Sequence, residues 1–181
     1  MNKILQSIAG RYNQQSDDSL LWKDIQTVLS CTESQAKKYA LSHCNSLSFY
    51  MGLFADDYIH TDYAEYFKIG YDSKLIDKYG YVKDKKKLCA LLGYKDFPMI
   101  MIRKWDDILN MNGIDPEKKY QVRIKTSWNK LKFKWNNHFM ICDVTLENGL
   151  LTIYDTWDKE YNGVSLFKKV NEKNFDAMME V

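Results

Sequence analysis

The apolar residues of this chain change their spacing partway along it, and this change constrains the fold more than any other feature. Up to about Gly113 they recur at the helical intervals of three and four residues. From Tyr120 to about Phe167 they alternate with polar residues or form short β-rich runs. Helices followed by an antiparallel sheet are typical of the α+β class. We therefore expect N-terminal helices packed on a C-terminal antiparallel sheet.

Composition favours one folded unit, a single domain over residues 1–181. The chain is 45% hydrophobic with only 8 Gly and 2 Pro, so it can bury a sizeable core. Its formal net charge of +2 provides no basic excess for nucleic-acid binding. The chain contains no run of 18 apolar residues, so no membrane span is predicted. Residues 1–10 are too short and polar for a secretory signal, so we expect the protein to be cytoplasmic. We also expect it to be a monomer.

Several segments of the first half combine helical spacing with capping signals. Residues 20–29 place apolar side chains on one face after two candidate caps, Asp18 and Ser19. Thr32-Glu33-Ser34-Gln35 fits a capping box, and residues 44–54 predict a buried helix. Shorter helices are expected at 63–67, 73–79 and 85–92, whereas 99–111 allows either a strand over 99–102 or one helix.

The second half predicts a sheet. Strands are expected at 120–125, 131–135, 138–144, 150–154 and 164–167. Glu147-Asn148-Gly149 lies between two of these runs, and Asn-Gly in that position is a strong hairpin signal.

The four cysteines, at positions 31, 44, 89 and 142, match no known metal motif. They contain no CxxC pair, and their spacing fits no zinc ribbon or finger. A disulfide framework is not expected in a chain without a secretory signal. His60 follows two aspartates, but with 3 His in the chain and no second cluster we expect no metal and no cofactor. What remains open is whether one cysteine is a reactive thiol.

Two further features are expected at the surface. His43 precedes Cys44 and should point away from it. A cluster of four lysines is most simply a solvated face: Lys83, Lys85, Lys86 and Lys87.

Three residues have the chemistry and placement of a catalytic set. A nucleophilic cysteine requires a stabilised thiolate, a base within reach and a group that orients the base. Cys44 begins a predicted helix, where unpaired N–H groups and the helix dipole favour an anion. His138 begins one strand of the predicted hairpin, and Asp155 follows the other. Paired strands can therefore bring the imidazole and the carboxylate together.

The register of the hairpin decides whether His138 and Asp155 can meet. A two-residue turn at Asn148-Gly149 would set Asp155 opposite Cys142, four residues and roughly 13 Å from His138. For the two side chains to face each other, the connection must contain a wider loop or a bulge. We predict the wider loop.

The segment from Cys44 to Leu53, CNSLSFYMGL, resembles the start of the central helix of papain-like cysteine peptidases. It is most similar to a bacterial subgroup akin to the bacteriocin-processing (double-glycine) peptidases. His138 with Phe-Met-Ile after it, and Asp155 beyond the hairpin, resemble the His and Asp strands of that family. Asp155-Thr156-Trp157 is also similar to the Asn-Ser-Trp of papain, where the Trp shields the His–Asn bond from water. The family often has Gly where this chain has His43 and Asn137.

The resemblance implies a papain-like fold with a core over about residues 33–168, and it implies a role for each residue. Cys44 would be the nucleophile, His138 the general base and acid, and Asp155 the group that orients the imidazole. Ser34-Gln35 resembles the Ser-Gln that precedes the family's Cys, which implies that Gln35 donates a hydrogen bond to the oxyanion. Such a donor is worth roughly 10²–10³ in rate. The capping box remains an equal alternative for Gln35.

The implied activity is hydrolysis of a peptide, isopeptide or peptidoglycan stem-peptide bond through a thioester. A small bacterial or phage murein hydrolase (endolysin) is one form of it, and such an enzyme can lack a signal peptide. The same three groups also serve acyl transfer in transglutaminase-like enzymes. The non-enzymatic alternative is a catalytically inactive peptide-binding module. Selective alkylation of Cys44 would separate enzyme from binding module, and product analysis with an added amine would separate hydrolysis from transfer.

Overall fold

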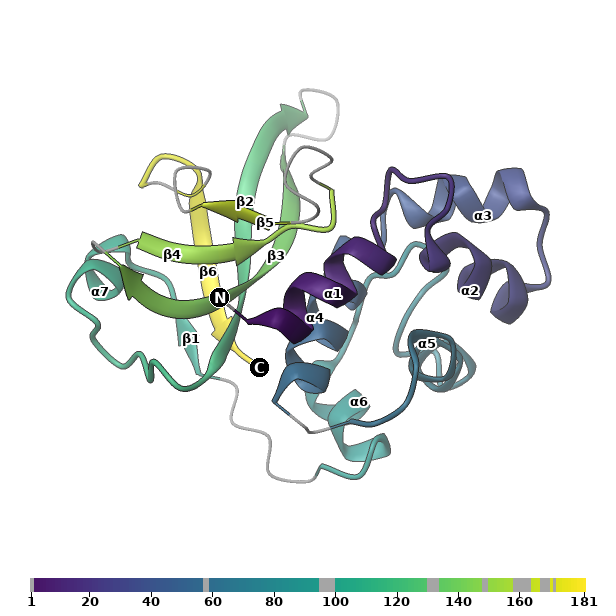
Figure 1. Cartoon of the computed structure of the whole chain (residues 1–181), viewed down its shortest axis with the longest axis horizontal. Coiled ribbons are helices and arrows are strands. Elements are labelled where there is room, and N and C mark those ends of the chain that lie inside the picture. The colour runs from purple at the N-terminus through teal and green to yellow at the C-terminus, as the bar shows by residue number, and fades with distance from the viewer. Residues whose placement is uncertain are drawn as a thin grey trace.

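Seven helices and six strands make up the part of the chain that the computed structural model describes. That part comprises residues 2–56, 59–94, 100–129, 134–147, 150–157, 164–166, 170 and 172–181. The architecture is α+β as predicted, because six helices precede the first strand (Figure 1). The helices are α1 (Lys3–Arg11), α2 (Leu20–Leu29), α3 (Glu33–Ala40), α4 (Cys44–Ala55), α5 (Tyr63–Asp72), α6 (Lys85–Leu91) and α7 (Trp105–Leu109). Across the described ranges, none of them is both long and apolar enough to cross a bilayer.

The strands form one antiparallel sheet in the order β1-β6-β2-β3-β4-β5. They are β1 (Met101–Ile102), β2 (Lys119–Asn129), β3 (Lys134–Glu147), β4 (Leu150–Tyr154), β5 (Val164–Leu166) and β6 (Phe175–Glu180). The predicted strands at 120–125, 138–144, 150–154 and 164–167 correspond to β2, β3, β4 and β5, although residue 167 lies outside the described ranges. Of the run predicted at 131–135, residues 131–133 lie outside the described ranges, and the last two begin β3.

Helix α4 connects the helical half to the sheet. All residues from Asn45 to Leu53 are buried, as expected for a helix that is covered on every side. One side packs against β2 and β3, and α1 and α5 cover other parts of it (Figure 1). The C-terminal residue approaches closely at Gly52, where an added Cβ would lie 2.5 Å from Cγ1 of Val181.

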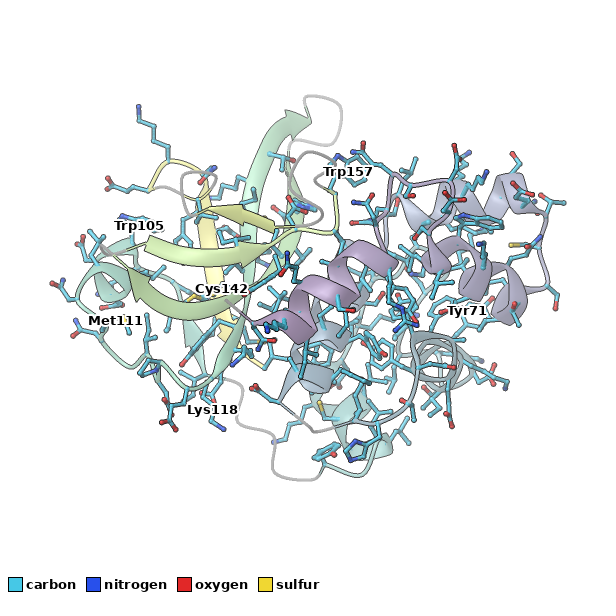
Figure 2. All side chains as sticks on the ribbon, viewed as in Figure 1. Tyr71, Trp105, Met111, Lys118, Cys142 and Trp157 are labelled. Atoms are coloured by element: carbon cyan, nitrogen blue, oxygen red, sulfur yellow. The ribbon has the colours of Figure 1, made fainter. Side chains whose placement is uncertain are left out.

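Within the described residues, both faces of the sheet contribute side chains to a hydrophobic cluster. Ile141 and Met179 belong to the hydrophobic cluster of the helical half, whereas their neighbours Cys142 and Met178 belong to a second cluster. Successive side chains of a strand point to opposite faces, so these neighbours lie on opposite sides of the sheet. Trp105 on α7 packs against the second cluster, at the end of the sheet far from the helical half (Figure 2).

The helices predicted from capping signals are confirmed. Helix α2 begins after Ser19, whose hydroxyl accepts the N–H of Leu21. Helix α3 begins with a complete capping box between Thr32 and Gln35. Helices also occupy the predicted ranges 44–54 and 63–67 and all but the last residue of 85–92, and α5 continues to Asp72. Both alternatives for residues 99–111 occur in part, since β1 is followed by the short α7.

The helix predicted at 73–79 is wrong. Asp77 Oδ1 accepts the backbone N–H groups of the residues two and four positions later, and such local bonds compete with helix formation. Gly80 then takes a positive φ of +73°, and Ile76 pairs with Val82 in an isolated antiparallel bridge.

Helix α1 and strand β6 are elements that the predictions omitted. Asn2 caps α1 by accepting the N–H groups of Ile4 and Leu5, which is a recognisable start signal. Strand β6 is buried at every position except Asp176. It therefore lacks the alternation of polar and apolar residues that marks a half-buried strand.

His43 is fully buried, so its expected surface position is wrong. Its Nδ1 lies 2.8 Å from the Tyr63 hydroxyl, and its Nε2 lies 3.2 Å from the carbonyl oxygen of Lys78. The Phe67 ring packs edge-on against the imidazole at 4.9 Å. Gly80 makes room for this ring, because a Cβ at that position would lie 2.6 Å from Cγ of His43.

Gly80→Ala should destabilise the protein much more than Gly113→Ala. The φ angles of the two glycines are nearly equal, +73° and +71°, so both variants acquire similar backbone strain. Only at Gly80 would the new Cβ meet other atoms within 4 Å. We expect Gly113→Ala to lower the free energy of unfolding by about 1 kcal/mol and Gly80→Ala by about 3 kcal/mol or more, measured by urea unfolding. Equal losses would contradict the close packing of Gly80 on His43.

Candidate active site

Cys44 is the first residue of α4, and it is half-buried. The N–H groups in the first turn of a helix have no partner inside the helix, and they carry the positive end of its dipole. The backbone around Cys44 therefore favours a negative charge, as expected from the sequence.

Buried hydrogen bonds hold the residues on both sides of Cys44. The Tyr63 hydroxyl lies 2.8 Å from Nδ1 of His43 and 2.6 Å from Oγ of Ser46. Asn45 Oδ1 accepts the N–H of Val82 at 3.2 Å. Because the three neighbours of Cys44 are each tied to other parts of the fold, the backbone of Cys44 has a defined position.

Two buried glutamines add to this support, and sequence reasoning missed both. Gln121 on β2 donates from Nε2 to the carbonyl oxygen of Asn45 at 2.8 Å and to Oγ of Ser48 at 2.6 Å. It thereby ties the first turn of α4 to the sheet. Neither glutamine belongs to a motif, so the sequence offers no signal for these roles.

The second glutamine, Gln14, joins the two sides of the site. Its Nε2 donates to the carbonyl oxygen of Ala40 at 2.8 Å, and its Oε1 accepts from Oγ1 of Thr156 at 2.8 Å. Its backbone N–H also donates to the carbonyl oxygen of Thr156, at 2.8 Å. Thr156 directly follows Asp155, and Ala40 lies four residues before Cys44, so Gln14 links the segment of the acid to the segment of the thiol.

His138 and Asp155 form a hydrogen bond, with 2.7 Å between Nε2 and Oδ1. Ile141 pairs with Tyr154 across β3 and β4. Continuing that register by one residue sets Asp155 opposite Met140, two residues from His138. The two side chains are thus diagonal neighbours on the same face, a separation that an imidazole can bridge.

The connection between β3 and β4 differs from the prediction. Glu147 pairs with Leu150, so the wider loop is wrong; Asn148 and Gly149 themselves lie outside the described residues. Between Asp143 and Glu147 the register shifts, which moves the pairing by two residues toward the one that His138 needs. The bulge, the other alternative for this hairpin, is therefore what brings the imidazole and the carboxylate together.

A second hydrogen bond, from the residue two positions later, also holds the Asp155 side chain. Its Oδ1 also accepts the backbone N–H of Trp157 at 2.9 Å, and the carboxylate is largely buried. The Trp157 ring stands edge-on to the His138 ring, with 6.2 Å between centroids. Trp157 lies where the sheet meets the helical half (Figure 2).

The environment of His138 keeps its ring protonated. Burial is the largest single effect and lowers the pKa. The hydrogen bond and negative charge of Asp155, together with the interaction with Cys44, outweigh burial and raise the pKa from 6.5 to about 10. At neutral pH the ring is therefore an imidazolium. Since Nε2 is bonded to Asp155, Nδ1 is the nitrogen left to hydrogen-bond with the sulfur of Cys44.

Two cavities meet at Cys44, one of about 620 Å³ and one of about 460 Å³. Ser42, Cys44 and Asn137 line both of them. The smaller cavity also contains His138, Asp155 and Trp157. The larger one extends in another direction, past Tyr79, Tyr81, Lys85 and Arg123. A substrate that occupies both cavities would pass over the sulfur.

The structure does not bring Gln35 to this site. Its Oε1 accepts the backbone N–H of Thr32 at 3.1 Å, and its backbone N–H donates to Oγ1 of Thr32 at 3.3 Å. This capping box, the alternative for Gln35, is confirmed. The side chain is exposed at the start of α3, and it lines neither cavity beside Cys44.

Within the described ranges, no three His, Cys, Asp or Glu side chains gather in a way that could hold a metal ion. Comparison of the chain with protein-family models, curated proteins and solved structures finds no match.

Acidification should destabilise the protein through His43. Burial lowers the pKa of His43 from 6.5 to about 4, so the folded chain keeps a neutral ring while the unfolded chain takes up a proton near pH 6.5. The stability that the folded chain gains by keeping His43 neutral is complete above pH 6.5. It is lost as the pH falls toward 4, by roughly 3 kcal/mol in total. We expect His43→Gln to be less stable at pH 7 and to lose this part of the pH dependence, measured by urea unfolding from pH 7 to 4. The same pH dependence in both proteins would contradict the assignment.

Proposed function

We propose that the chain is a papain-like cysteine peptidase or amidase in which Cys44, His138 and Asp155 form the catalytic triad. One observation carries the proposal: Nε2 of His138 hydrogen-bonds to the Asp155 carboxylate at 2.7 Å, and Cys44 lines the same cavity and interacts with the same imidazole. A thiol, an imidazole and a carboxylate in this order meet the requirements for an activated nucleophile. The position of Cys44 at the head of a buried central helix, opposite His138 and Asp155 on the sheet, also supports a papain-like arrangement.

The reaction begins with attack of the Cys44 sulfur on the carbonyl carbon of the scissile amide. The electron pair of the C=O bond moves to the oxygen, and the backbone N–H of Cys44 donates to that oxyanion. The C–N bond then breaks as His138 transfers its proton from Nδ1 to the leaving amine, and an acyl thioester remains on Cys44. Next, His138 removes a proton from water, which attacks the thioester. The carboxylic acid leaves and the sulfur regains its starting state.

Asp155 and Trp157 act on the imidazole. Asp155 holds Nε2, so that Nδ1 faces the sulfur, and its charge stabilises the imidazolium that protonates the leaving amine. Trp157 limits the access of water to this bond, which strengthens the interaction. The substrate classes consistent with the site are a peptide, an isopeptide or a peptidoglycan stem peptide, processed by the single catalytic domain expected over residues 1–181.

Cys44 should be the most reactive thiol of the chain. Cys31 is a matched control, because it is also half-buried, whereas Cys89 and Cys142 are buried, and burial raises the pKa of Cys89 to about 12. At pH 6.5 we expect iodoacetamide to alkylate Cys44 about 100-fold faster than Cys31, because only Cys44 has an imidazole beside it that can activate the sulfur. His138→Ala should remove most of that difference. Mass spectrometry of quenched digests measures the rates, and equal rates at Cys44 and Cys31 would favour an inactive binding module.

Hydrolysis itself can be tested with a mixture of terminally blocked peptides and with purified peptidoglycan sacculi. New amino groups should appear with the wild-type protein and with Cys31→Ala, but not with Cys44→Ala. Asp155→Ala should lower the rate roughly 10²-fold or more, because the imidazole loses its orienting partner. An added primary amine that is incorporated in place of water would assign the protein to the acyltransferases. No new amino group and no amide from any substrate would contradict the proposal.

A further inference from the structure

The larger cavity is placed to hold the acyl half of the substrate, if the proposed function holds. His138 must protonate the leaving amine, so the leaving half lies in the smaller cavity, which His138 lines. The acyl half, which stays attached to Cys44, extends the other way into the larger cavity. That cavity shares Lys85, Arg123, Met101 and Phe139 with an adjoining recess of about 50 Å³. On this measure a space of roughly 10–15 Å³ holds one water, so the recess has room for a small polar group such as a carboxylate.

The side chain of Lys85 lines this recess. The prediction that Lys85 belongs to a solvated face of four lysines is therefore wrong for this residue. Its Nζ donates to Oε1 of Gln121 and lies 5.1 Å from the centroid of the Phe49 ring and 5.8 Å from that of Phe139. Burial, followed by the charge of Arg123, lowers the pKa of Lys85 to about 7. Among the ion pairs between described residues, none contains Lys85. Its Nζ is therefore in contact with an amide and with rings, and no carboxylate in the described ranges is paired with it.

Arg123 brings a second positive charge to the same recess. It forms an ion pair through Nε with Asp176, but Asp176 also lies 3.5 Å from Nζ of Lys125. One carboxylate thus serves two cations. The carboxylate of Asp84, which lines the larger cavity, accepts the backbone N–H of Lys87 at 3.0 Å and lies 3.6 Å from its Nζ. Among the described residues, the recess therefore keeps an excess of positive charge whenever Lys85 is protonated, and a bound carboxylate would favour that protonated form.

We propose that Lys85 and Arg123 bind a side-chain carboxylate in the acyl half of the substrate, so that the enzyme selects peptides with an acidic residue shortly before the scissile bond. An incoming carboxylate relieves the repulsion between the two cations and bonds to both. The walls contributed by Met101, Phe139 and Met179 are apolar, and they strengthen the attraction by excluding water. The uncharged amide of Gln121 orients Lys85 without neutralising it.

The test uses blocked tripeptide chloromethyl ketones that differ only in Glu, Gln or Lys at each of the three positions before the ketone. The Cys44 sulfur forms a bond to the methylene carbon and chloride leaves, and mass spectrometry follows the rate at Cys44. At one position we expect Glu to react about tenfold or more faster than Gln, and Lys to react more slowly than Gln. Lys85→Met, which keeps the apolar stem, should reduce the Glu preference to about threefold or less. Lys86→Met, a change at the exposed neighbour, should leave it unchanged.

Two results would overturn the inference, and they can be told apart. Equal rates for the Glu and Gln probes at all three positions, with Cys44 still labelled faster than Cys31, would reject acidic selectivity and leave the proposed function standing. Labelling of Cys44 no faster than Cys31 by every probe would reject both proposals. The comparison of probes on the wild-type protein requires no variant, so it decides the matter even where Lys85→Met fails to fold.

Discussion

The packing of α4 between the sheet and the other helices is the constraint on which the site depends. This helix carries Cys44 at its first residue, and its burial fixes that residue against β2 and β3. Gln121 ties the first turn to the sheet, while Tyr63 ties it to α5. A hydrophobic contact alone is not directional, and these buried hydrogen bonds define the position of the helix along and around its axis.

Electrostatics then divides the region around the sulfur into two parts. On one side, Asp155 and His138 form a buried pair in which the imidazole keeps its proton at neutral pH. On the other side, Lys85 and Arg123 place positive charge in a recess with apolar walls. In the proposed enzyme the first side performs the proton transfers and the second selects the substrate, so chemistry and specificity are served by different charges on either side of one thiol.

Local patterns predicted the elements well and the exceptions have identifiable causes. Capping residues such as Ser19 and Thr32 mark helix starts through bonds within a few residues, which a sequence displays directly. The predicted helix at 73–79 fails because Asp77 bonds to nearby N–H groups. His43 is polar and precedes a helix, features typical of the surface, yet a glycine 37 positions away leaves room for its ring. No local pattern contains that information.

The sequence by itself determined the α+β class, most helix starts, and the three residue types whose order and placement suggest a cysteine nucleophile. Only the tertiary structure decided that His138 meets Asp155, because that contact depends on a register shift inside a strand. It also decided that Gln35 caps a helix away from Cys44 and that Lys85 faces a cavity. The physical reason is the same in each case: periodicity and capping are local properties, whereas register, burial and charge neighbourhood arise from segments far apart in the chain.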